Sequence, residues 1–223
     1  MIKVVILGTY SRIRYNKLVE ILIFQLIVLL FSVVIHEVSH GVVAERLGDP
    51  TARLAGRLTL NPIKHLDLFG SFLLPLSLYF ISGGGFIFGW AKPVPYNPLN
   101  LKNPEKGGGL IAAAGPLSNF ALAIIFGFLF RFLNFFPFEE NLLISLGQFF
   151  SVIILVNVML GIFNLMPIPP LDGSKILFAL LPRGASQIRM FLERYGIFLL
   201  LLFIFFGFRL ITPIVFAIYG LLI

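Results

Sequence analysis

Apolar residues fill most of the chain and are interrupted at only a few places by polar or helix-breaking residues. The longest apolar runs cover residues 18–47, 110–136, 142–165 and 190–223. Each of them is long enough to cross a bilayer as a helix, because about 20 apolar residues span the hydrocarbon core. The last run is broken near Gly207 and Pro213 and is expected to hold one or two helices.

The segment between the first two long runs has a different pattern. Hydrophobic and polar residues alternate over residues 52–60, which predicts a short strand or hairpin. Residues 66–81 are apolar but short and contain Gly70 and Pro75, which favours a re-entrant or surface-packed element. Residues 83–109 are rich in Gly, Pro and Asn and predict loop and extended chain.

The predicted fold is therefore an all-α polytopic membrane protein. It is a transmembrane helix bundle with a short β or re-entrant region between the first and second long helices. The length and the lack of a hydrophilic stretch long enough for a soluble module indicate one integral-membrane domain over residues 1–223. Basic residues before residue 18 resemble the start of a signal peptide, but we expect the first run to be retained because it carries the motif described next.

Composition narrows the class of protein. With 58% hydrophobic and 12% charged residues, the chain is not expected to fold as a water-soluble globule, and the lipid bilayer is an expected partner. The net charge of +7 comes from Lys and Arg between apolar runs, which favours membrane orientation over nucleic-acid binding. Since there is no cysteine, a bound metal must use His and carboxylate ligands.

A candidate metal motif lies inside the first apolar run, where residues 36–40 read His-Glu-Val-Ser-His. His36 and His40 lie one turn apart on one face of a helix, where both imidazoles can reach a single zinc ion, with Glu37 beside it. Ionisable groups are costly at membrane depth and usually functional. The pattern therefore predicts an intramembrane metal site.

Two histidines leave zinc under-coordinated, and the main candidates for a third ligand are His65, Asp67 and Asp172. Asp172 follows an apolar helix that ends in prolines, where broken backbone needs a lined cavity at membrane depth, so we favour it. A short helix is expected over residues 174–181. His65 is interpreted either as a proton relay or a contact behind the ligands, or as a turn histidine beside a helix-capping Asp67.

Three motifs together are similar to those of the site-2 protease family of intramembrane zinc metalloproteases. Residues 36–40 match its HExxH motif, residues 164–173 match N-x-x-P-x-P-x-x-D-G, and residues 115–119 resemble the Gly-Pro segment of its intervening helix. The resemblance covers residues 18 to about 180. Residues 61–67 and 88–93 resemble the compact branch without PDZ or CBS domains, so control by such domains is not expected.

The resemblance implies an enzyme, a zinc metalloendopeptidase that acts on a transmembrane protein or peptide substrate. Zn²⁺ would be held by His36, His40 and Asp172 and keep its fourth position for water. Glu37 would act as general base on that water. Asn164 is expected to hold the substrate carbonyl or oxyanion, although it could instead cap the end of its helix.

The motifs also restrict the topology. The histidines and Asp172 share a depth only if helices 18–47 and 142–165 run parallel, so residues 66–81 must not cross. More Lys and Arg then flank the metal end than the opposite end, although the basic N-terminus argues the other way. We expect a multi-pass protein of the cell membrane with its zinc site toward the cytosol.

Alternatives and secondary interpretations remain open from the sequence. A membrane metal-ion transporter would also use intramembrane His and Asp, but it has no need of Glu37 and often shows two related halves. A catalytically dead scaffold is disfavoured by the intact motif.

Asn119 and Asn157 are expected to form interhelical hydrogen bonds. Residues 83–109 could pair with substrate as an extended edge, and the sequence leaves open whether the enzyme serves regulated intramembrane proteolysis or clearance.

Overall fold

The computed structural model describes residues 10–81, 89 and 91–223, and every regular element in these ranges is helical. Among them, four helices are long and apolar enough to cross a membrane: Ile23–Arg46, Pro104–Phe135, Glu140–Asn164 and Ser186–Gly207. This confirms the predicted multi-pass helical class.

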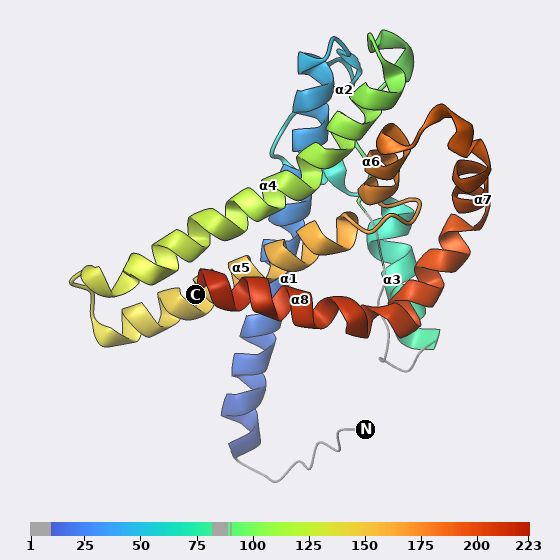
Figure 1. The fold of residues 1–223 in the computed structure, drawn as a ribbon. Helices are drawn as coiled ribbons and strands as arrows, with labels where there is room; N and C mark the ends of the chain where they lie inside the picture. Colours follow the sequence, from blue (N-terminus) through green and yellow to red (C-terminus); the bar gives the residue numbers. More distant parts are fainter. Residues whose placement is uncertain (1–9, 82–88, 90) are drawn as a thin grey trace.

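The elements follow one another as a series of long helices joined by short helical turns (Figure 1). The long helices are α1 (Tyr10–Arg46), α4 (Pro104–Phe132), α5 (Glu140–Asn164) and α7 (Ser186–Leu202). The shorter α-helices are α2 (Thr51–Leu54), α3 (Leu74–Ile81), α6 (Asp172–Leu180) and α8 (Phe208–Leu222). Single 3₁₀ turns lie at Pro62–His65, Pro98–Asn100, Leu133–Phe135 and Arg183–Ala185. Short π-helices at Leu68–Leu73 and Phe203–Gly207 lead into α3 and α8.

The strand or hairpin predicted for residues 52–60 is wrong. Residues 51–54 form α2, and Gly56 adopts a left-handed φ of 64° that allows the Arg57 N–H to reach the Ala52 carbonyl at 2.9 Å. Ala52 is fully buried while residues 53–56 are exposed. The alternation of hydrophobic and polar residues here thus belongs to a helical turn with one buried side chain and not to a strand.

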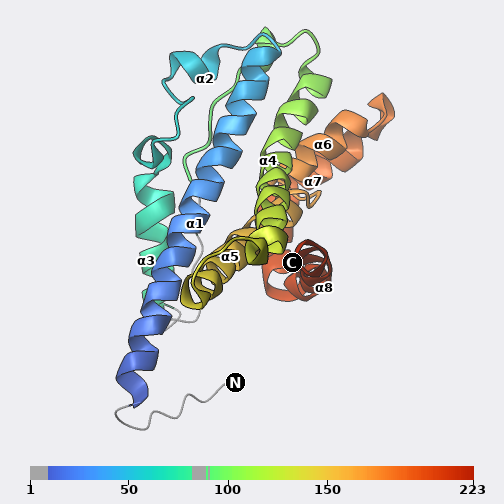
Figure 2. The same cartoon turned by 90° about the vertical axis from the view of Figure 1, so that its left-hand side faces the viewer.

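The apolar segment before the second long helix is helical but short. Its π-helix and α3 together cover Leu68–Ile81, and their axis is roughly aligned with that of α1 (Figure 2). The segment is not among the four candidate spans, as its length predicted. Residues 83–88 and 90 of the predicted loop, and with them part of the predicted substrate-pairing edge, lie outside the described residues. Residues 91–97 belong to no helix or strand.

Helix α4 is the central element of the fold and contacts α1, α5 and α6. One apolar cluster joins α4, α5 and α8 and consists of Ala123, Ile154, Val158, Ile162, Ile211 and Val215. A second cluster, Ala44, Leu101 and Ile111, joins the end of α1 to the first part of α4. These contacts fix the C-terminal half of α1 against α4, where the metal motif lies.

Two buried charged groups on either side of α2, Arg57 and Asp49, hold the extended chain before α4 in place. Arg57 is only 7% exposed, and its guanidinium donates to the carbonyls of Lys64, Lys92 (2.6 Å) and Pro93 (3.2 Å). The Lys92 N–H in turn donates to the His65 carbonyl at 2.8 Å. A buried cation that binds three carbonyls ties the 61–65 turn to residues 92–93.

Asp49 holds the other end of the extended segment before α4 by hydrogen bonds. Its fully buried carboxylate accepts from the Asn97 N–H at 2.6 Å, from Asn100 Nδ2 at 2.7 Å and from Thr51. Burial by itself raises the pKa of the Asp49 carboxyl, but the donors on Thr51, Asn100 and Asn97 lower the pKa below its usual value. The folded protein therefore stabilises the charged form of Asp49.

Replacement of Arg57 by Ala is expected to lower the free energy of unfolding by about 3 kcal/mol, because hydrogen bonds to a charged donor contribute about 1.5–3 kcal/mol each and the carbonyls stay buried. Unfolding in detergent micelles, followed by circular dichroism, measures this change. The matched control is Arg53→Ala, since the Arg53 side chain is 66% exposed in an ion pair with Glu45. Equal stability of the two variants would contradict the role given to Arg57.

Candidate metal centre

Three potential ligand groups from distant parts of the chain converge at one point. Asp172 Oδ2 lies 3.0 Å from His36 Nε2 and 3.1 Å from His40 Nε2, and the ligand atoms all lie within 4.8 Å of one another. All three side chains are largely buried, with 12% exposure or less. They form the one group of this kind among the described residues.

The two imidazoles are oriented by α4 rather than by their own helix. His36 Nδ1 lies 2.6 Å from Asn119 Oδ1, and His40 Nδ1 lies 2.6 Å from the Ile111 carbonyl. Both partners are acceptors, so each Nδ1 carries the hydrogen and each Nε2 presents a lone pair. This is the tautomer that a metal ligand needs, and the supporting acceptor is typical of metal-binding histidines.

Gly115 lies between these two contacts on α4 and leaves room beside the imidazoles. A Cβ at this position would overlap Nε2 of both His36 and His40. Ile111, Gly115 and Asn119 are spaced by four residues and therefore share one face of the helix. That face of α4 forms the wall of the site.

The donor set fits a divalent metal ion. Two imidazole lone pairs and a carboxylate oxygen face one another at close range, which is unfavourable unless a cation lies among them. Tetrahedral zinc with bonds of about 2.0–2.2 Å would separate its ligand atoms by about 3.3 Å, close to the 3.0 and 3.1 Å between Asp172 and the imidazoles. Three nitrogen and oxygen ligands from the protein are the number that a catalytic zinc site uses, with the fourth position kept for water.

Asp172 reaches this point because the chain turns sharply after α5. Residues 167–170 contain three prolines that prevent the helix from continuing, and α6 then begins at Asp172 itself. Gly173 packs so closely on the backbone of Leu165 and Met166 that a Cβ would overlap their carbonyls.

A buried chain of amides continues from His36 into the bundle. Asn119 Nδ2 donates to Asn157 Oδ1 at 2.9 Å, and Asn157 Nδ2 donates to Ser32 Oγ at 2.9 Å. Asn119 and Asn157 are fully buried, and Ser32 is 3% exposed. The expected interhelical hydrogen bonds of the two asparagines are confirmed, and the contact of Asn119 with His36 is an addition that the sequence did not show.

Glu37 lies next to the convergent groups on α1 and is half-buried. Its Oε2 accepts a hydrogen bond of 2.8 Å from the Val94 N–H of the extended chain. The same chain is the one that Arg57 and Asp49 fasten. One carboxylate oxygen of Glu37 is thereby fixed in direction, while none of the hydrogen bonds found among the described residues uses Oε1.

The other polar residues considered as ligands or catalytic groups make contacts within their own turns and helices. His65 is fully buried and its Nε2 donates to the Thr59 carbonyl at 2.8 Å, and Asp67 Oδ1 accepts from the Gly70 N–H at 2.6 Å. Neither belongs to the convergent group, so the turn histidine and the capping aspartate are the interpretation that the contacts favour. Asn164 is half-buried and its Nδ2 donates to the Leu160 carbonyl of α5 at 3.0 Å.

Comparison with known proteins places this arrangement in a family. Residues 24–149 and 139–203 match the model of peptidase family M50. The chain belongs to peptidase family M50. Among relatives, it is 43% identical over 184 residues to YwhC of Bacillus subtilis, named as a candidate zinc metalloprotease, with 81% of this chain and 80% of the relative covered.

Two further relatives carry names of the same kind. A candidate zinc metalloprotease of Methanocaldococcus jannaschii is 32% identical over 162 residues, with 73% of each chain covered. The candidate zinc metalloprotease Rip2 of Mycolicibacterium smegmatis is 29% identical over 144 residues, which cover 65% of this chain and 52% of the relative. No solved structure matches this M50 chain.

Replacement of Gly115 by Ala is expected to abolish metal binding by the M50 chain, because the added Cβ would displace both imidazoles. Metal content after equilibrium dialysis measures this loss. Gly147→Ala on α5 is the matched control, since its Cβ would meet the nearest atom at an ordinary 3.7 Å. A Gly115→Ala protein that retains one metal ion per chain would show that α4 does not wall the site.

Replacement of Asn119 by Ala is expected to weaken metal affinity by about 10–100-fold, the usual effect of losing an acceptor behind a histidine ligand. Competition with a metal chelator of known affinity gives the change. Asn141→Ala, on the exposed first turn of α5, should leave the affinity unaltered. Unchanged affinity in Asn119→Ala would mean that the His36 tautomer is set without this contact.

Proposed function

We propose that this M50 chain is an intramembrane zinc metalloprotease that hydrolyses peptide bonds of membrane-spanning substrates. The observation that carries the proposal is the convergence of His36, His40 and Asp172 beside Glu37 on an apolar helix. Membership of a peptidase family supports hydrolysis, and the names of the relatives support zinc. We assign the three convergent residues as the zinc ligands.

The chemistry divides between the metal and one carboxylate. When bound, zinc supplies Lewis acidity, which polarises the scissile carbonyl and lowers the pKa of a water to about 7. Glu37 accepts a proton from this water at the carboxylate oxygen that Val94 does not hold, and then donates the proton to the leaving amine. The contact with Val94 keeps the base oriented throughout.

Asn164 is our candidate for stabilising the substrate oxyanion. It lies at the last position of α5, eight residues before Asp172, in the motif shared with the site-2 protease family. Its amide nitrogen donates one hydrogen to Leu160, and the second hydrogen is available for a substrate oxygen. An uncharged donor of this kind stabilises negative charge without competing for the metal.

The site is proposed to face the cytosolic side of the cell membrane. Asp172 follows the end of α5 by eight residues and contacts the C-terminal half of α1, which supports a topology in which α1 and α5 end toward the same side of the membrane. Lys and Arg are more numerous beside that end, which is the usual cytosolic pattern. Residues 68–81, too short to cross, are proposed to enter the membrane from that side and return.

A metal-ion transporter receives no support from the comparisons, whose names all describe proteases. The residues that the structure describes hold a single cluster of metal ligands at one depth. A transport pathway would need further ligands along a route through the bundle. The protease function is therefore the one that the site supports.

Replacement of Glu37 by Gln is expected to reduce cleavage of a labelled single-pass substrate by at least about 100-fold, as for loss of a general base, while zinc content is retained. Asp172→Ala should lose both zinc and cleavage. Purified protein in lipid vesicles, analysed by gel for product and by chelator assay for zinc, gives both quantities.

The control for this experiment is Glu45→Gln, two turns further along α1, where the carboxylate pairs with Arg53 outside the site. It should cleave like the wild type. Full activity of Glu37→Gln would remove Glu37 as the base. Retention of zinc by Asp172→Ala would remove Asp172 as a ligand.

A further inference from the structure

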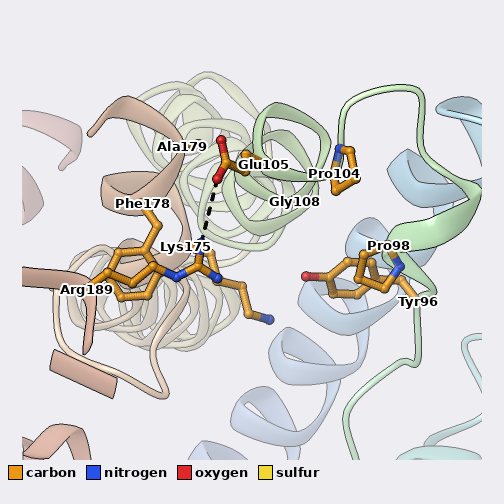
Figure 3. A pocket seen from close by; sticks show the side chains of 9 residues that line it. All are labelled: Tyr96, Pro98, Pro104, Glu105, Gly108, Lys175, Phe178, Ala179 and Arg189. Carbon is orange, nitrogen blue, oxygen red and sulfur yellow. Dashed lines mark ion pairs between the residues drawn. The ribbon is translucent and has the colours of Figure 1, made fainter. Parts of the chain in front are cut away.

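A cavity of about 160 Å³ lies between the start of α4, helix α6, the first turn of α7 and the extended chain before α4 (Figure 3). The ring of Tyr96 forms one side, and Phe178 forms the other. The Lys175 ammonium points into the space between them, 5.3 Å from the centre of the Tyr96 ring. The Tyr96 hydroxyl points into the same space (Figure 3).

Two walls of this cavity continue from the metal centre. Lys175 lies three residues after Asp172 on α6, and Gly108 lies three residues before Ile111 on α4. Each pair is separated by less than one helical turn of about 5.4 Å. The cavity is thus the next space along α4 and α6 from the residues that form the site.

The third wall continues from the proposed general base. Tyr96 follows two residues after Val94, whose N–H holds Glu37. The chain that carries both is extended, and an extended residue advances about 3.3–3.6 Å. A substrate bound in an extended conformation at the zinc site would therefore place in the cavity a side chain about two to four residues from the scissile bond.

The two cations at the cavity differ in their surroundings. Arg189 Nε donates to Glu193 at 2.9 Å, Nη1 lies 3.8 Å from Glu105, and the guanidinium stacks on Phe178. In contrast, no carboxylate among the described residues lies within 4.0 Å of the Lys175 ammonium. Its contact is the face of an aromatic ring, which leaves its hydrogens for an incoming acceptor.

We propose that this cavity is a substrate subsite that binds an acidic side chain, Asp or Glu, in the polar flank of the membrane-spanning substrate. The carboxylate pairs with the Lys175 ammonium and accepts from the Tyr96 hydroxyl. Arg189 is already neutralised and closes the far side with Phe178. The inference rests on the proposed function, since it gives that protease a preference for charge beside the cleavage point.

The test uses three versions of one labelled single-pass substrate that the wild type cleaves. They carry Glu, Gln or Lys at the positions two to four residues from the cleavage point, on either side in turn. Cleavage rates in vesicles are compared for wild type, Lys175→Glu and Tyr96→Phe. The matched control is Lys102→Glu, an exposed lysine just before α4 that does not line the cavity.

The wild type and Lys102→Glu should cleave the Glu version about fivefold faster than the Lys version at low substrate concentration, the size of one partly exposed ion pair. Lys175→Glu should reverse this order, because its carboxylate would attract lysine. Tyr96→Phe should reduce the preference without reversing it. A preference that is absent in wild type, or that survives in Lys175→Glu, would overturn the proposal.

Two other outcomes would also contradict the subsite. An equal loss of rate for all three versions in Lys175→Glu would give Lys175 a structural role only. A preference that stays the same while Lys175→Glu, purified in detergent, loses binding of added phosphatidylglycerol would assign the cavity to a lipid phosphate instead.

A binding measurement separates this proposal from the protease function. Fluorescence anisotropy with short peptides bearing the Glu or Lys flank is measured on Glu37→Gln and on Glu37→Gln/Lys175→Glu. One outcome is that the wild type shows no cleavage of any substrate, while Glu37→Gln binds the Glu peptide more tightly than the Lys peptide and Glu37→Gln/Lys175→Glu binds the Lys peptide more tightly. In that case the subsite stands and the protease function fails. Equal binding of both peptides would overturn the subsite.

Discussion

Each histidine of α1 donates its Nδ1 hydrogen to α4, and the geometry of the site depends on these two contacts. At membrane depth no bulk water is present to accept these hydrogens, so the acceptors must come from the protein. Asn119 and the Ile111 carbonyl provide them at 2.6 Å each. With the Nδ1 atoms occupied, both Nε2 lone pairs have one direction left, and this direction is toward Asp172.

The same requirement explains the polar interior behind the site. An asparagine that accepts from His36 has an NH₂ group that also needs partners, and Asn157 and Ser32 complete the series. The series links α1, α4 and α5 without a charged group. On the other side of α1, Arg57 and Asp49 fix the chain that orients Glu37, so the ligands and the base are held by separate sets of contacts.

Much of this arrangement could be predicted from the chain itself. The apolar runs identify the spans, since length and hydropathy suffice for them, and the His-Glu-Val-Ser-His spacing places two imidazoles together on any helix. The prolines before Asp172 indicate where the backbone turns. These features depend on local sequence, where periodicity and backbone chemistry act directly.

The remainder depends on how helices meet. A carbonyl such as that of Ile111 exists at every residue, so nothing in the sequence distinguishes the one that faces His40. The clearance at Gly115 appears only once α1 lies against α4. The strand predicted for residues 52–60 is wrong because their hydrophobic and polar residues alternate as in a half-buried strand, although Ala52 is the one buried residue of the four-residue helix α2.

The spacing of Ile111, Gly115 and Asn119 has a consequence for motion along the helix axes. An axial slip of α4 by four residues, about 6 Å, would put Ala123 opposite His36 and Gly115 opposite His40. His36 would then face a methyl group instead of an amide oxygen, and its ring would be free to change tautomer. The register of α4 against α1 thus decides whether His36 meets an acceptor, so the tautomer of this imidazole is tied to how the two helices pack.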